Sequence, residues 1–297
     1  MTGAVGDRSE FGFQLFLYVL LTAVAIVTLY PFLNVLAISL NDSTDTVRGG
    51  IYVWPREFTW ANYATIFHYQ SLLTGFRNSV LRTVLGTVIG VFSAAMVAYV
   101  LSRADFQARR LFSLYLALTM YFSGGLIPGY MLMRNLHLIG TFWIYIIPAI
   151  MSVWNVYVIR SYIDGLPYSL QESAKLDGAN DFVIFTRIIL PLCKPVLATI
   201  ALFIAVGHWN AWFDTYLFNS NKPNLTTLQF ELQKILLSTT QDGSNAHKVN
   251  SVASIATVSP ESIKMAITIV VTAPILVVYP FLQKYFVKGI TLGAVKS

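Results

Sequence analysis

Uncharged stretches long enough to cross a membrane recur along this sequence. Residues 11–40 contain no Asp, Glu, Lys or Arg over thirty positions. A helix needs about 20 apolar residues to cross a bilayer, whereas the apolar core of a cleavable signal peptide has only about 7–15. We therefore predict that residues 11–40 form a membrane-spanning helix that is retained.

The composition excludes a water-soluble globule. Only 11% of the 297 residues are charged and 56% are hydrophobic, and the mean hydropathy is +0.62. Soluble domains have about 25% charged residues, so we predict an all-α membrane protein. The net charge of +6 is interpreted as contact with anionic lipid rather than nucleic acid, because no basic run is longer than Arg109–Arg110. Cys193, the single cysteine, is predicted to be a packing residue.

Six membrane-spanning helices are predicted, with both termini in the cytoplasm. Their bounds are about 11–40, 72–101, 111–122, 141–159, 196–218 and 262–281. Gly and Pro after residue 122 break the third span, and residues 126–136 are interpreted as a re-entrant or interfacial piece. The cytoplasmic assignment follows from Lys and Arg: more than half of the 20 lie in the pieces placed inside, which form less than a quarter of the chain.

The second span carries small residues at three- and four-residue spacing, which lets helices approach closely. They are Gly86, Gly90, Ala94, Ala95 and Ala98. Arg77 and Arg82 lie in its first turns and are expected to snorkel to the interface. We therefore expect no charged residue at mid-depth in any span, and Asp214 lies toward the outer end of the fifth.

Two polar segments are assigned to the outer face. The first, residues 41–70, contains aromatic residues typical of an interfacial belt, namely Tyr52, Trp54, Trp60 and Tyr63. The second is an extracytoplasmic loop, residues 219–261. Leu228, Leu232 and Ile235–Leu236 within it predict an amphipathic helix.

One polar segment, residues 166–195, separates the fourth and fifth spans and reads as a helical hairpin. Leu170, Ala174 and Leu176–Asp177 follow at helix-like spacing, with Glu172 and Lys175 three apart on the wetter side. Gly178 suits the left-handed residue that ends a helix, and Asn180 suits the cap of the next. The second helix is expected to stop before Pro191, because the residue before a proline resists the helical conformation.

The sequence contains no catalytic or metal-binding motif. There is no GxxxxGK[ST] phosphate loop, no HExxH zinc motif and no cysteine pair, and the four histidines are scattered. We predict neither an enzyme nor a bound cofactor. Without mid-depth charges, a carrier that works alone is disfavoured. The residues by themselves leave three alternatives open: an importer driven by another protein, an ATP-independent carrier or channel, and a membrane enzyme. The hairpin is then either a docking element or a mere connection.

Several motifs resemble those of ABC importer permeases. Glu172-Ser173-Ala174, Asp177-Gly178-Ala179 and Ile189-Leu190-Pro191 look like the EAA loop of that family. Ala98–Arg103, Trp209-Asn210 and the tail Gly289–Lys296 are similar to its carbohydrate-uptake class. YFSGGLIP, SVWN, ESAKLDGAND and AVGHWNAWF look like the subgroup that imports acidic or complex oligosaccharides, such as aldouronate or alginate fragments.

The resemblance implies a type I ABC importer permease fold in the bacterial cytoplasmic membrane. It implies a second permease, two ATPases that hold ATP and magnesium, and an extracytoplasmic sugar-binding protein. Residues 166–195 would be the cytoplasmic coupling hairpin. Its ATPase-coupling residues would be Glu172, Ser173, Ala174, Asp177, Gly178, Ala179 and Pro191.

Two further sites follow from the resemblance. The tail would supply a second ATPase contact through Gly289, Gly293 and Lys296. The sugar path would be lined by aromatic and polar side chains of the fourth and fifth spans, since aromatic faces and hydrogen-bonding groups suit sugar rings. They are Asn155, Tyr157, Trp209, Asn210, Trp212 and Asp214. The alternative for these six is helix packing and an interfacial belt.

Overall fold

A computed structural model describes residues 4–240 and 259–294 of the chain. Within these residues the secondary structure is helical, with one isolated β-bridge between Asn41 and Phe58. The chain forms two compact units. The first comprises residues 1–69 and 234–272, and the second comprises residues 70–233 and 273–297.

Among the described residues, three helices are long and apolar enough to cross a membrane. They are the segments Glu10–Ser39 of α1 (Ala4–Ser39), Gln70–Ser102, which is α4, and Pro260–Val278 of α14 (Pro260–Ala294). These helices coincide with the first, second and sixth predicted spans.

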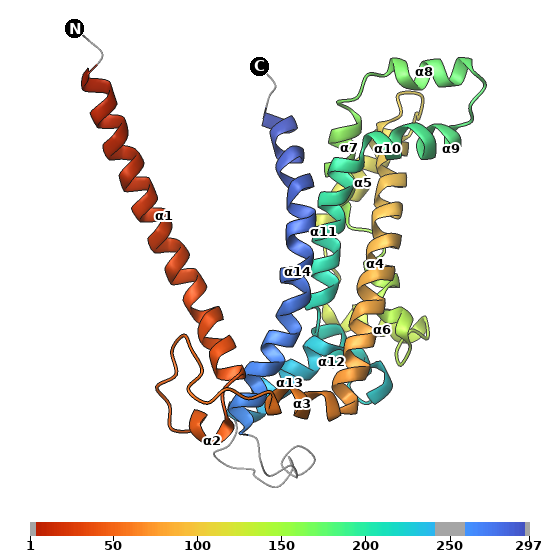
Figure 1. Ribbon diagram of the computed structural model, residues 1–297. Helices are drawn as coiled ribbons and strands as arrows, with labels where there is room; N and C mark the ends of the chain where they lie inside the picture. The colour runs from red at the N-terminus through yellow and green to blue at the C-terminus, as the bar shows by residue number, and fades with distance from the viewer. Residues whose placement is uncertain (1–3, 241–258, 295–297) are drawn as a thin grey trace. The chain divides into compact units, whose positions relative to one another are not determined.

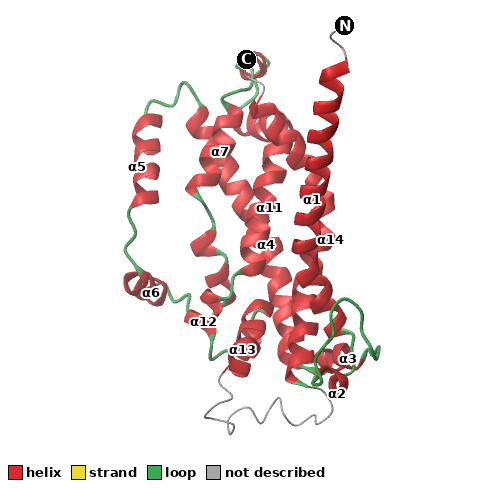
Figure 2. Cartoon of the chain, turned by 90° about the vertical axis from the view of Figure 1, so that its left-hand side faces the viewer, coloured by secondary structure: helices red, strands yellow, loops and turns green. Residues whose placement is uncertain are grey.

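Three bent helix pairs lie in the regions of the other three predicted spans, and two of them extend well beyond the predicted bounds. α5 (Arg109–Tyr121) and α6 (Leu126–Asn135) meet at 117°, at a break that ends in two glycines (Figure 2). The short 3₁₀ helices η1 (Phe142–Tyr145) and η2 (Ile147–Ala149) meet α7 (Val153–Ile163) at 47°. The segment Asp181–Leu192 meets α11 (Lys194–Asn210) at 82°. If each pair is one span, the chain has up to six.

The first unit is held together by buried polar side chains that follow α1. α2 (Ser43–Thr46) and α3 (Ala61–His68) belong to it. Asn62 is fully buried and donates to Ser39 O at 2.8 Å and Asn41 O at 2.9 Å. Asn41 in turn donates to Asp45, which also pairs with Arg56 at 2.9 Å. The Asn62 amide thus supplies hydrogen bonds to two backbone carbonyl oxygens at and just beyond the end of α1.

That first unit presents most of the predicted aromatic belt outward. Trp54 is 83% exposed, and Tyr52 and Trp60 are also exposed. Asn34 of α1 donates to the carbonyl oxygens of Ile51 and Tyr52, both at 2.8 Å. Tyr63 differs, because it is half-buried and its hydroxyl pairs with Ser39 at 2.8 Å.

The core of the second unit is formed where α4, α7 and α11 lie side by side (Figures 1 and 2). The small residues predicted on one face of α4 are all buried there. A Cβ at Gly86 would lie 2.6 Å from His208 Cδ2, and one at Gly90 would lie 3.3 Å from Ile204 Cδ1. The small-residue stripe therefore allows α11 to approach α4, as predicted.

The two ends of α4 carry different structures. Near its start, Asn78 donates to the carbonyl oxygens of Asn224 and Thr226 at 2.9 and 2.8 Å. This fastens η4 (Pro223–Leu225) to α4, between α12 (Phe213–Asn219) and α13 (Leu228–Thr240). α13 begins at Leu228 and confirms the helix predicted there. The hairpin lies at the other end of α4 (Figure 1), about 50 Å away for a 33-residue helix.

Candidate functional site

The hairpin has the two short helices and the glycine corner that the sequence predicts. α8 spans Ser169–Leu176, and Gly178 follows with φ 81°. α9 (Asp181–Ile184) then begins, and the Asn180 side chain accepts from Val183 N at 2.9 Å. The corner therefore depends on a residue without Cβ and on a side-chain cap.

The second half of the hairpin corrects the prediction that the helix stops before Pro191. The chain widens into a π-helical turn, η3 (Phe185–Ile189), and continues as α10 (Leu190–Leu192). Pro191 lies at the start of α10, where its missing N–H breaks no helical bond. Buried Cys193 follows at the corner to α11, and its backbone N–H donates to the Ile189 carbonyl oxygen at 2.9 Å. Its predicted packing role is confirmed, since it belongs to the core of the unit.

The faces of α8 differ from the predicted ones. Gln171 and Ala174 are its buried residues, whereas Leu176 is 89% exposed. Leu170 and Leu176 are thus exposed, as are Glu172 and Lys175, which were predicted to form the wetter side. Ser173 and Asp177 are exposed too. Ala174, Ala179 and the first turns of the second half pack in the core shared with α4, α7 and α11. The hairpin thus has one face continuous with that core and one face open.

A cluster of charges joins the hairpin to the end of α4. Arg103 follows α4 directly and is only 7% exposed. It donates from Nε to Asp105 at 2.7 Å, from Nη1 to the Tyr99 hydroxyl at 3.0 Å, and pairs with Asp181, the first residue of α9. Lys175 of α8 reaches Asp105 at 3.0 Å. These contacts lie outside the spans, on the hairpin side.

The charge cluster determines the protonation of Asp105. Hydrogen bonds from Arg103, and then from Lys175, hold the pKa of the Asp105 carboxyl well below its ordinary value of 3.8. Because the pKa is lower in the folded protein, the contact contributes its full stability above that ordinary value. This contribution declines as pH falls from there through the lowered pKa. The cluster is therefore intact at neutral pH.

At the opposite end of α4, a buried ion pair corrects the prediction that Arg82 snorkels. Its side chain is 2% exposed and pairs with Asp214 of α12. Nη1 also donates to Ala211 O at 3.2 Å, in the break between α11 and α12. The guanidinium carbon lies 4.6 Å from the centre of the Tyr145 ring. The charge of Arg82 is thus tolerated inside a span because Asp214 neutralises it.

The six residues of the predicted sugar path occupy different environments. Tyr157 donates to Ser113 O at 2.6 Å, and Asn155 is buried on the same helix. Asp214 binds Arg82, and Trp212 packs edge-on against Phe213. Asn210, by contrast, is exposed at the end of α11.

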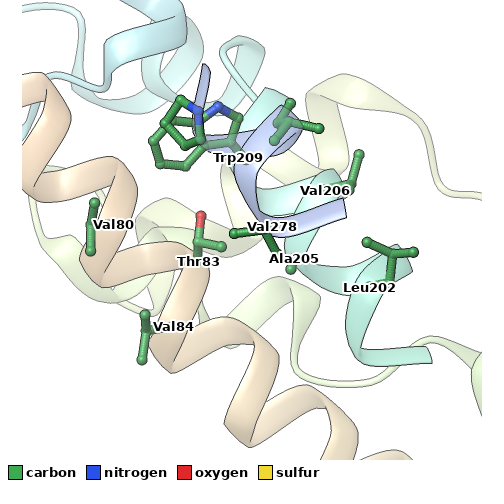
Figure 3. Close-up of a pocket in the computed structure, with 10 residues that line it drawn as sticks. Val80, Thr83, Val84, Leu202, Ala205, Val206, Trp209 and Val278 are labelled. Carbon is green, nitrogen blue, oxygen red and sulfur yellow. The ribbon is translucent and has the colours of Figure 1, made fainter. Parts of the chain in front are cut away.

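Trp209 borders an apolar pocket of about 230 Å³ (Figure 3). Its walls come from α4, α11 and α14: Val80, Thr83, Val84, Leu202, Ala205, Val206, Trp209, Pro274, Ile275 and Val278. Thr83 contributes the one hydroxyl of this lining. A sugar ring needs several hydrogen-bonding partners, so the pocket suits an apolar group better than a sugar.

The tail predictions fall partly outside the described residues. Gly289 and Gly293 belong to α14, and Lys296 lies beyond residue 294, where the description ends. Within the described parts of the chain, no three His, Cys, Asp or Glu side chains gather as a metal site would require.

Four polar residues make contacts that the sequence-based predictions did not assign to them: Arg82, Arg103, Asp105 and Asp181. Arg103 and Asp181 lie within the sequence motifs that resemble those of the permease family. Their position in these motifs was the only indication in the sequence that they have a role. Nothing in the sequence pairs Arg82 with a carboxylate 132 positions away.

Comparisons with known proteins match one family along nearly the whole chain. A family model described as "Binding-protein-dependent transport system inner membrane component" matches residues 15–292. The polygalacturonan/rhamnogalacturonan transport system permease protein YtcP of Bacillus subtilis is 35% identical, over 96% of this chain and 98% of that protein. The arabinooligosaccharides transport system permease protein AraQ of Halalkalibacterium halodurans is 31% identical, over 92% of this chain and 93% of that protein.

A solved structure is similar too. A chain from the crystal structure of a bacterial ABC transporter involved in the import of the acidic polysaccharide alginate has a TM-score of 0.85 and 29% identity. The match covers 94% of this chain and 98% of that chain.

Proposed function

Because the chain belongs to the family of binding-protein-dependent transport system inner membrane components, we propose that it is the transmembrane subunit of an ATP-driven oligosaccharide importer. Relatives along nearly its whole length are named as permeases of polygalacturonan/rhamnogalacturonan and arabinooligosaccharide transport systems, which supports a carbohydrate cargo. The observation that carries the proposal is the hairpin, which is rooted in the core of the spans and open on its outer face.

The hairpin is the site through which the ATPases drive the conformational change of the permease. α8 docks in a cleft of an ATPase through Glu172, Ser173, Leu176 and Asp177, and Gly178 holds the corner. Ala174 and Ala179 face this protein's own core, so their small size lets the hairpin pack closely against that core. Closure of the ATPases then moves the hairpin and the spans together. The result is a rigid-body switch between inward- and outward-facing states.

The cargo is an acidic oligosaccharide. Two of the similar proteins handle uronate polymers by name, polygalacturonan and alginate, and the second is similar in structure as well as in sequence. The exposed Asn210 and the residues Trp212 and Asp214 at the α11–α12 break lie at the end of the unit opposite the hairpin, and they are the proposed sugar contacts nearest the outer face.

The topology of the chain and its partner proteins follow from its proposed role as an ABC importer permease. In this proposal the chain crosses a bacterial inner membrane six times, and both termini and the hairpin lie on the cytoplasmic side. A second permease completes the pathway, two ATPases hold ATP and magnesium, and a sugar-binding protein delivers cargo to residues 219–261. The tail with Gly289, Gly293 and Lys296 is a second ATPase contact. An ATP-independent carrier or channel is the alternative function.

Replacing Leu176 tests the docking face. Removing an apolar side chain from a protein contact costs about 1.5–3 kcal/mol, and a charge placed there costs more. We therefore expect Leu176→Asp to reduce the ATPase that co-purifies with the permease by about tenfold or more. Leu176 is 89% exposed, so the amount of permease in the membrane should not change.

Leu176→Met is the matched control, because it keeps an apolar side chain of similar volume and should retain the ATPase. Equal co-purification with Leu176→Asp and the wild type would contradict the docking face. Failure of the wild type to bring down any ATPase would contradict the proposed function itself.

A further inference from the structure

We propose that Arg103 is the positioning residue that makes the coupling hairpin and α4 move as one body. This inference rests on the proposed function, because it describes how a push on the hairpin reaches the spans. It assigns a role in coupling to a charged side chain that lies outside the docking motif.

Arg103 is placed where three segments meet. It stands one residue beyond the end of α4, contacts Asp105 in the turn that leads to α5, and pairs with Asp181 at the start of α9. Asp181 lies just after the Gly178 corner and the Asn180 cap. The arginine therefore holds the corner of the hairpin against the end of a long helix.

All the nitrogens of this guanidinium are used. Nε and Nη2 bind the two oxygens of Asp105, and Nη1 serves both Asp181 and the hydroxyl of Tyr99. Such a planar, forked arrangement fixes direction as well as distance. A lysine ammonium is a single point charge on a flexible stem and does not reproduce it.

An aromatic contact lies directly beneath the charges. Tyr99 stacks on Phe185 of η3 with ring centres 5.4 Å apart, and Phe92 meets the same ring at 5.8 Å. The hairpin is thus joined to α4 by an apolar layer and a polar layer. Arg103 belongs to both, since its guanidinium carbon lies 5.7 Å from the centre of the Tyr99 ring.

Burial distinguishes Arg103 from its neighbours in the cluster. Lys175 and Asp105 have side chains 40% and 50% exposed, and such exposed pairs contribute little. The Arg103 side chain is 8% exposed, so its contacts are less screened by solvent. α8 itself buries only Gln171 and Ala174, which leaves Arg103 as the main polar link between the hairpin and α4.

The test measures transport and ATP hydrolysis separately in the reconstituted complex of permeases, ATPases and binding protein. We expect Arg103→Ala to lower sugar uptake per ATP hydrolysed by about tenfold, the loss typical of removing a charge-assisted contact. The ATPases should remain bound and active. Arg103→Lys should recover only part of the coupling. Arg110→Ala, an exposed arginine of the same region, is the control and should behave as the wild type.

Asp181→Ala provides a second variant that the fold should tolerate, because that side chain is 64% exposed. We expect it to lower uptake per ATP by about threefold, since one of the contacts to Arg103 is removed. Unchanged uptake per ATP in both Arg103→Ala and Asp181→Ala would overturn the inference. Loss of bound ATPase from both variants would also overturn it, because the role would then be structural. A wild-type complex without ATPase would instead refute the proposed function.

Discussion

Gly178→Val is expected to abolish most ATP-dependent uptake while leaving the protein in the membrane. Gly178 has φ 81°, and a Cβ built on it meets no atom within 4 Å. The effect must therefore come from backbone strain rather than from a clash. Holding an L-residue in this region costs about 1–2 kcal/mol, and more for a β-branched side chain. The corner would open, and α8 would lose its direction relative to α4.

Gly178→Asn is the matched control for this variant, because asparagine adopts the left-handed region far more readily than valine. We expect uptake by Gly178→Asn to stay within about threefold of the wild type, and uptake by Gly178→Val to fall by about tenfold or more. Equal uptake by the two variants would contradict a coupling role for this corner. The measurement is sugar uptake normalised to permease in the membrane.

Asp214→Leu is expected to destabilise the second unit strongly, because it leaves Arg82 buried without its carboxylate. Removing one partner of a buried ion pair costs about 3–5 kcal/mol. The Asp214 side chain is 26% exposed, so we expect the lower end of this range. Thermal unfolding of the purified protein should occur at a clearly lower temperature than in the wild type.

The double variant Arg82→Met/Asp214→Leu separates pairing from packing. It removes both charges and fills the space with apolar side chains, so most of the lost stability should return. Arg77→Met, an exposed arginine five positions earlier on the same helix, should change the unfolding temperature little. If Asp214→Leu unfolds at the wild-type temperature, the ion pair does not support this end of the unit.

Local signals in the sequence predicted the hairpin well. Gly178 and Asn180 act within a few residues of themselves, so their roles can be derived from backbone preference and side-chain capping alone. The small residues of α4 are similar, because helical spacing alone places them on one face. The motif match then supplied the family, which the comparisons confirm.

Errors arose where a residue's partner is distant in the sequence. Arg82 was placed at the interface because its neighbours do not reveal Asp214. Leu176 was grouped with Ala174, because helical spacing does not say which face the core covers. Pro191 was expected to end a helix, but a π-helical turn before it allows the chain to continue. Each outcome depends on tertiary packing that sequence periodicity does not encode.

The most direct test of ATP-driven import is uptake into proteoliposomes that contain the full complex with its binding protein. Labelled alginate, galacturonan and arabinan oligosaccharides would be offered with and without ATP on the ATPase side. Uptake of an acidic oligosaccharide that requires ATP hydrolysis and is lost in Gly178→Val is the predicted result. Uptake by this chain alone, without ATPases and without ATP, would contradict it.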